Sequence, residues 1–369
     1  MRNLFFCVFF LTFFSCFCVH DSLRLQLAEI NSFANDKNKF SQLYELGFSV
    51  RAEDPIFSFS CASELLRCAA AEGDSFFVAR AYNLFGILYY RNQEFNNALL
   101  CHRKALQLRM NISDESERAA SYTNLGNVYS DLENFEESEK FHLKALSIFY
   151  LLKNKKQILN CWCNLGILKK QQGDFVAAEG NLTQSLLMAE ELNDMEAQAM
   201  CSTNLGWLFE EQNKNDEAIS YYLESVRLNE RMERYASLAR SCFVVGRFYR
   251  LNGKLSDASS WLNRSLHISD SIHSDEILQL ALNELAEVKH QQGKEEEAYS
   301  LLKRCREIDD LMLGELPDMT GPLPELPSVS KIQLDNDRSY HLWIIGSLCF
   351  ALVIVFIWGL NRKNKIAHE

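Results

Sequence analysis

Six segments of this chain repeat at a constant interval of 40 residues. Three successive segments carry the phrase Asn-Leu-Gly, and the others carry variants of it. The small residue that closes each phrase is Gly86, Gly126, Gly166, Gly206, Gly246 or Ala286. A constant period over six units indicates that one supersecondary element was duplicated and stacked. Stacked repeats present a long surface, so this period favours a binding function over catalysis.

Small residues recur at two further places in each unit. When the glycine is numbered as position 8, position 20 is Ala98, Ser138, Ala178, Ala218, Ala258 and Ala298. Position 27 is Ala105, Ala145, Ser185, Ser225, Ser265 and Cys305. A turn separates two stretches of helical periodicity within each unit. We therefore expect two antiparallel helices that approach closely at the small residues.

This pattern resembles the tetratricopeptide repeat. The unit has 40 residues instead of the commoner length of about 34, as in the repeats of kinesin light chains and of spindle-orientation scaffolds. The resemblance implies an all-α, right-handed solenoid of about fifteen helices. It covers six units over residues 74–313, and residues 21–73 are expected to form capping helices and a degenerate repeat.

The N-terminus is typical of a secretory signal peptide. Arg2 precedes an apolar run over residues 4–14 that is too short to cross a bilayer. We expect residues 1–20 to be this signal. Two alternatives remain open, namely lipidation of Cys16 and an uncleaved anchor.

A second apolar run, residues 342–360, contains no charged residue. It would span about 28 Å as a helix, which is enough for the hydrocarbon core. Arg362 and Lys363 follow it, so the positive-inside rule places the tail, residues 361–369, in the cytoplasm. The repeats then lie outside the cytoplasmic membrane, in the periplasm of a diderm bacterium. A proline-rich stalk, residues 314–341, joins them to the span.

The chain is acidic, with a formal net charge of −11. This charge argues against nucleic acid as a partner. No glycine-rich phosphate loop, CxxC pair or HExxH motif occurs. We therefore expect no enzyme activity, no cofactor and no metal site.

Eight cysteines lie outside the predicted signal and span, and their spacing is not that of a disulfide framework. We favour small buried core cysteines over bridges. Cys161 and Cys201 share position 3 of neighbouring units and could approach each other. His102 and His142 share position 24, where a core role is favoured over a metal or pH-sensing role.

Asparagine occupies position 6 in three successive units, at Asn124, Asn164 and Asn204. The resemblance implies that the first helix of each unit lines a concave groove and that an asparagine ladder pairs with the backbone of an extended peptide. An amide both donates and accepts hydrogen bonds, which suits this role. The alternative is that these asparagines join neighbouring helices.

Other candidate groove residues flank the asparagines. Position 9 is Asn127, Trp207 and Arg247 in three units, and an exposed aromatic there would anchor a partner. Arg240, Arg247 and Arg250 form a stripe on the fifth first helix that suits a carboxylate or an acidic segment. The alternative is a solvated basic face balanced by acidic residues of the previous unit.

These features predict a membrane-anchored scaffold or receptor whose groove binds an extended peptide or protein segment. The chain also resembles the exported repeat region of membrane signalling proteins of Bacteroidota-like bacteria. The alternative function is therefore a sensor subunit that lacks its own output domain and acts through a separate signalling partner.

Overall fold

The computed structural model describes residues 22–52 and 54–313, which form helices joined by turns. The predicted signal peptide, stalk, membrane span and tail lie outside these residues. Among the helices that are described, none is both long and apolar enough to cross a bilayer. The all-α expectation is confirmed for the described part of the chain.

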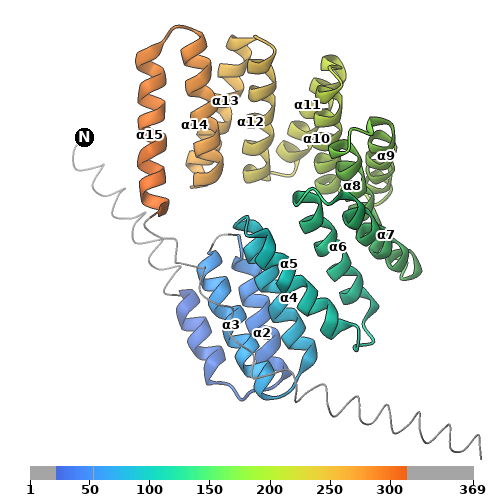
Figure 1. Ribbon diagram of the computed structural model, residues 1–369. Helices are drawn as coiled ribbons and strands as arrows, with labels where there is room; N and C mark the ends of the chain where they lie inside the picture. The colour runs from blue at the N-terminus through green and yellow to red at the C-terminus, as the bar shows by residue number, and fades with distance from the viewer. Residues whose placement is uncertain (1–21, 53, 314–369) are drawn as a thin grey trace, which may run out of the picture.

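A short helix over residues 22–32 comes first. The helices that follow are α2 (Lys37–Val50), α3 (Pro55–Ala71), α4 (Ser75–Arg91), α5 (Phe95–Arg109), α6 (Glu115–Asp131), α7 (Phe135–Leu151), α8 (Lys155–Gln171), α9 (Phe175–Glu191), α10 (Met195–Glu211), α11 (Asn215–Arg231), α12 (Tyr235–Leu251), α13 (Leu255–Ser271), α14 (Asp275–Gln291) and α15 (Glu295–Leu313). Successive helices pack as antiparallel pairs along a curve that brings the last pairs round toward the first (Figure 1).

The helices are joined by short turns that have the same backbone geometry in successive units. The side chain of Asp174 accepts a hydrogen bond from the backbone N–H of Ala177 (3.1 Å) and caps the first turn of α9. The preceding residue, Gly173, has a φ of +77° and ends the turn after α8 in the left-handed region. Glu133 and Asn213 adopt the same conformation in equivalent turns, with φ of +57° and +59°. The turn geometry is therefore kept where the residue is not glycine.

In the first five units, the position-8 glycine of the first helix faces the position-24 side chain of the partner helix. A Cβ atom built on Gly126 would lie 2.6 Å from Cε1 of His142, and one built on Gly166 would lie 2.6 Å from Cγ of Leu182. A Cβ atom at these glycines would therefore require the facing side chain or the helix pair to shift. The buried position-24 residues above the five glycines are His102, His142, Leu182, Tyr222 and Leu262.

The small residues at positions 20 and 27 lie in the contact between paired helices, as predicted. All are buried, and three of the serines donate hydrogen bonds to main-chain carbonyls, whereas Ser225 accepts one from Thr203. Ser138 donates to the carbonyl of Gly126 (2.8 Å), and Ser265 donates to the carbonyl of Ala239 (2.7 Å). These serines satisfy their own polar groups while keeping the helices close.

The first helices of the units line the inner side of the curve. Helices α4, α6, α8 and α10 contact one another in succession, as do α12 and α14, and the side chain of Arg247 on α12 bonds to Glu210 on α10. On a curved stack, elements on the inner side are closer together than those on the outer side. Their free faces therefore form the concave surface of the array.

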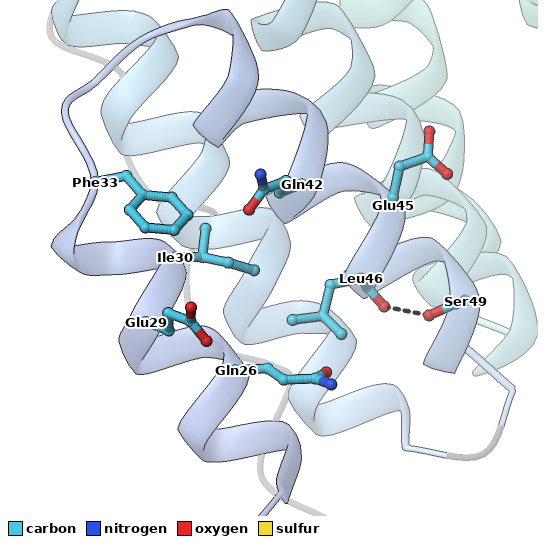
Figure 2. Close-up of a pocket in the computed structure, with 8 residues that line it drawn as sticks. All are labelled: Gln26, Glu29, Ile30, Phe33, Gln42, Glu45, Leu46 and Ser49. Carbon is cyan, nitrogen blue, oxygen red and sulfur yellow. Dashed lines mark hydrogen bonds between the residues drawn. The ribbon is translucent and has the colours of Figure 1, made fainter.

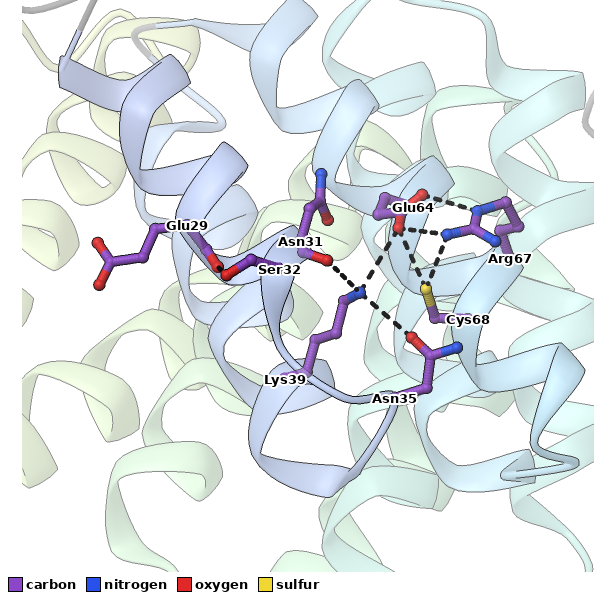
Figure 3. Close-up of polar contacts among 8 residues, drawn as sticks. All are labelled: Glu29, Asn31, Ser32, Asn35, Lys39, Glu64, Arg67 and Cys68. Atoms are coloured by element: carbon purple, nitrogen blue, oxygen red, sulfur yellow. Dashed lines mark hydrogen bonds and ion pairs between the residues drawn. The ribbon is translucent and has the colours of Figure 1, made fainter.

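A buried lysine ties the first helix to the array (Figure 3). Lys39 is 3% exposed, and its ammonium donates to the carbonyl of Asn31 and to Oδ1 of Asn35, both at 3.2 Å. The carboxylate of Glu64 lies 3.9 Å from the same ammonium. Burial of this charge is compensated by these partners, so residues 22–32 are held against α2 and α3.

Replacing Gly166 by alanine should destabilise the array by about 1–3 kcal/mol, because the new Cβ would collide with Leu182. Gly180 on α9 is the matched control, since a Cβ there meets no atom within 4 Å. Gly180→Ala should instead stabilise the helix by about 0.5–1 kcal/mol. Thermal unfolding followed by circular dichroism measures both changes. Equal effects of the two substitutions would contradict the close-approach argument.

Candidate functional site

A cavity of about 640 Å³ opens on the concave surface between α10 and α12. We call it the inner cavity. The residues that line it include Lys170, Trp207, Glu210, Glu211, Phe243 and Arg247. Its volume lies within the range of ligand pockets, about 300–1000 Å³. Two predicted groove residues, Trp207 and Arg247, come together here although they lie on different helices.

Two carboxylates hold the polar side chains of the inner cavity. Glu210 accepts a hydrogen bond from the hydroxyl of Tyr222 (2.5 Å) and another from the guanidinium of Arg247 (3.3 Å). Glu211 pairs with the ammonium of Lys170 at 2.7 Å. Burial and the neighbouring Glu210 carboxylate raise the pKa of Tyr222 above its usual value, so its hydroxyl remains a donor. Both acidic groups are therefore occupied by partners within the array.

Two aromatic side chains also line the inner cavity. Trp207 on α10 is 36% exposed, and the ammonium of Lys170 lies 6.0 Å from the centre of its ring. Phe243 on α12 is half-buried beside it. The cavity thus combines an accessible indole with a phenyl ring, the types of side chain that anchor partners at interfaces.

Two of the three asparagines of the predicted ladder form hydrogen bonds with the previous first helix. Asn124 donates from its amide to Oδ1 of Asn83 (2.8 Å), and Asn204, 6% exposed, donates to the thiol of Cys163 (3.2 Å). Each of these bonds joins position 6 of one first helix to position 5 of the previous one. Asn164 is half-buried and has no side-chain hydrogen bond within the described part of the chain. The structure therefore favours the alternative, in which asparagines join neighbouring helices.

The other predicted groove residues do not lie together, because their side chains pair with different helices or lie outside the inner cavity. Arg240 pairs with Glu276 (2.9 Å) and Arg250 pairs with Glu284 (2.5 Å), so both are directed toward α14. Arg247 pairs in the opposite direction, with Glu210 on α10. Asn127 is half-buried on α6 and does not line the inner cavity. The stripe of three arginines is thus divided, and only Arg247 contributes to the cavity.

Sequence reasoning missed Lys170 and Phe243 as cavity residues. Both occupy positions that face the groove in this repeat class, position 12 and position 5, so the repeat numbering could have identified them. Neither stands out by residue type alone. Their place in one cavity with Trp207 depends on how neighbouring units are rotated, which the sequence does not specify.

The predicted core role of the two histidines is confirmed by their burial. His102 and His142 are 2% and 1% exposed, and Nδ1 of each has no hydrogen-bond partner among the described residues. Burial, with a contribution from the charge of Arg109, lowers the pKa of His102 to about 3. Burial lowers the pKa of His142 to about 4. Both imidazoles are therefore neutral in the folded protein at neutral pH.

The eight described cysteines are buried and unbridged, as we favoured from the sequence. The sequence left open an approach of Cys161 to Cys201. In the structure the thiol of Cys201 lies 3.1 Å from the hydroxyl of Ser185, and Cys161 is buried and unbridged. Over the part of the chain that the structure describes, no cluster of His, Cys, Asp and Glu has a geometry that could hold a metal ion.

A second cavity lies at the N-terminal end, between residues 22–32 and α2 (Figure 2). Its apolar wall is formed by Ile30, Phe33 and Leu46. The hydroxyl of Ser49 donates to the carbonyl of Leu46 (2.8 Å) and so does not point a free donor into the space. This cavity contains none of the predicted groove residues.

The family model described as tetratricopeptide repeat matches residues 77–151, 117–191 and 157–231. These residues form tetratricopeptide repeats. The inner cavity lies between α10 and α12, the first helices of two neighbouring units. Helix α10 lies within the matched residues, and α12 follows shortly after them. No curated protein matches the sequence.

Several solved repeat structures share the fold. The apo form of RapI is 14% identical over 75% of this chain and 99% of its own, with a TM-score of 0.55. A Rap protein complexed with competence and sporulation factor is 15% identical over 80% and 99%, with a TM-score of 0.51. The Rap conjugation gene regulator of plasmid pLS20, in complex with the Phr* peptide, is 12% identical over 83% and 96%, with a TM-score of 0.53. At these identities the similarity concerns the fold alone.

Asn204→Ala should lower the free energy of unfolding by about 1 kcal/mol, because the buried hydrogen bond to Cys163 is lost. Asn164→Ala should change it by less than about 0.5 kcal/mol. Urea unfolding of the two variants tests this difference. A larger loss for Asn164→Ala would show that the structural role is assigned to the wrong asparagine.

His142→Leu should raise stability at neutral pH by about 1–2 kcal/mol, because it removes a buried nitrogen without a partner. Leu182 and Leu262 occupy the same position in other units, so the packing tolerates leucine. The unfolded histidine protonates near pH 6.5, whereas the folded one does so only near pH 4. Stability of the wild type therefore falls as the pH decreases through this window. Unfolding midpoints from pH 7 to pH 4 should decrease less for the variant, and parallel curves would contradict the assignment.

Proposed function

We propose that this protein is a membrane-anchored scaffold whose concave surface binds an extended peptide or protein segment outside the cytoplasmic membrane. The inner cavity is the observation that carries the proposal. It places an exposed indole, a phenyl ring and two cations on the inner side of the array, where neighbouring first helices would contact a bound segment. An interface of this kind draws most of its binding energy from a few such anchors.

Two further observations support parts of the proposal. One structure of the same fold contains a bound Phr* peptide, which is consistent with peptide binding by this architecture. The uncharged run over residues 342–360, followed by Arg362 and Lys363, supports a single C-terminal span with the array outside. The proposal assigns no catalytic step to the array.

The test is a crosslinking pull-down from intact cells with a reagent that does not cross the cytoplasmic membrane. Trp207→Ala should lose the partner that wild type captures, because the main aromatic anchor of the inner cavity is removed. Tyr235→Ala is the matched control, since Tyr235 is an exposed aromatic at the start of α12 that does not line the cavity. This control should retain the partner.

Two results would contradict the proposal. Equal capture by both variants would place the contact on another surface. Capture only after the cells are lysed would show that the array does not meet its partner outside the cytoplasmic membrane.

A further inference from the structure

We propose that the turn between α7 and α8 lies on the surface of a lipid bilayer that contains anionic lipid. The contact is made by Tyr150, Leu151 and Leu152, which we call the apolar tip, and by the lysines that follow them. The inference rests on the proposed function in one respect, namely that the array is held at a membrane. It concerns an edge of the array that does not line the inner cavity.

The apolar tip differs from the equivalent turns of the other units. All three of its side chains are exposed, and Leu151 is 83% exposed. Position 34, which Leu152 occupies, is apolar in all five turns that join the six units and therefore has a role in the fold. Position 33 is instead Asn111, Leu151, Glu191, Arg231 and Ser271. Four turns thus fold without an apolar residue at position 33, so the fold does not account for Leu151.

A tryptophan extends the apolar tip. The indole N–H of Trp162, which is half-buried on α8, donates to the hydroxyl of Tyr150 (3.1 Å). Tyrosine and tryptophan are enriched where a bilayer meets water, because each has an apolar ring and one polar group. A single exposed leucine would need no explanation, but here tyrosine, leucine and tryptophan are next to one another.

Three lysines follow the apolar tip directly, at Lys153, Lys155 and Lys156. In the corresponding segments of the other four turns, the charges sum to zero or to a negative value. Lys155 pairs with Glu191 (2.5 Å), whereas Lys153 has no ion-pair partner within the part of the chain that the structure describes. The ammonium of Lys156 is 3.7 Å from Asp194, and its side chain is 71% exposed. Two cations are therefore available to anionic headgroups, which attract basic residues beside an apolar surface.

The position of the apolar tip favours a bilayer over a second protein as its partner. Because the helix pairs are antiparallel, every second helix ends at the same edge of the array. Helix α7 ends at Leu151, and α15 ends at Leu313, from which the chain continues to the proposed span, residues 342–360. The tether thus leaves the array from the edge that carries the apolar tip. A bilayer that holds the span can also meet the tip.

The experiment uses the full-length protein reconstituted into vesicles of phosphatidylcholine and phosphatidylglycerol. A fluorescent unnatural amino acid replaces Leu151 in one preparation and Val176 in another. Val176 is the matched control, since it is 85% exposed near the start of α9, at the opposite edge of the array. Nitroxide groups within the acyl chains quench only a probe that enters the bilayer. The probe at residue 151 should be quenched several-fold more strongly than the probe at residue 176.

The lysines test the preference for anionic lipid. Replacing Lys153 and Lys156 by glutamine should lower the equilibrium constant for insertion of the tip by about five-fold for each lysine. Vesicles of phosphatidylcholine alone should have a similar effect on the wild type. Lys140→Gln is the matched control, since Lys140 is exposed on α7 and pairs with Glu137 (2.8 Å) away from the turn. It should keep the full quenching, and unfolding midpoints verify that all variants fold.

Flotation of the same vesicles separates this inference from the proposed function. Equal quenching at both probe sites, in protein that floats with the vesicles, would show that the tip does not touch the bilayer while the anchor stands. Quenching that is unchanged in the double lysine variant would overturn the recognition of anionic lipid. If Leu151→Glu, which introduces the residue type of Glu191, abolishes flotation, the tip attaches the protein by itself and the proposed span is wrong. If the wild type does not float, both proposals are wrong.

Discussion

The close approach of two helices at one glycine is the constraint on which the rest of this structure depends. Position 8 is glycine in five units, so the position-24 residue of the partner helix packs directly on the backbone, as Leu182 does on Gly166. The small residues at positions 20 and 27 keep the same separation along the pair. Because five successive pairs pack through the same glycine contact, they stack with one repeated geometry and generate a curve.

Polar contacts between neighbouring first helices then fix the register of the stack. The bonds from Asn124 to Asn83 and from Asn204 to Cys163 each join residues 41 apart in sequence. A second series lies nearer the helix ends, where Ser130 bonds to Gln171 and Lys170 bonds to Glu211, also 41 apart. Several polar residues on the inner side are consequently used to hold the array together. Trp207 and Phe243 remain accessible beside these internally paired groups.

The electrostatics of the inner cavity follow from this internal use of charge. The chain as a whole is acidic, with a net charge of −11, yet the carboxylates of Glu210 and Glu211 are committed to partners within the array. What remains accessible is the donor side of Arg247 and the indole of Trp207. Net charge therefore describes the solubility of such a chain, whereas ligand preference depends on local pairing.

The sequence alone determined the helix pairs, their length and the positions of close contact, because these depend on local periodicity and on side-chain size repeated every 40 residues. It also identified Trp207 and Arg247 as groove residues from their position in the unit. Only the tertiary structure decided which polar residues join neighbouring units and which face a ligand. That choice depends on the rotation between stacked pairs, which brings Asn204 to Cys163 and Arg247 to Glu210. No local pattern encodes this rotation, because it arises from the packing of whole helix faces against each other.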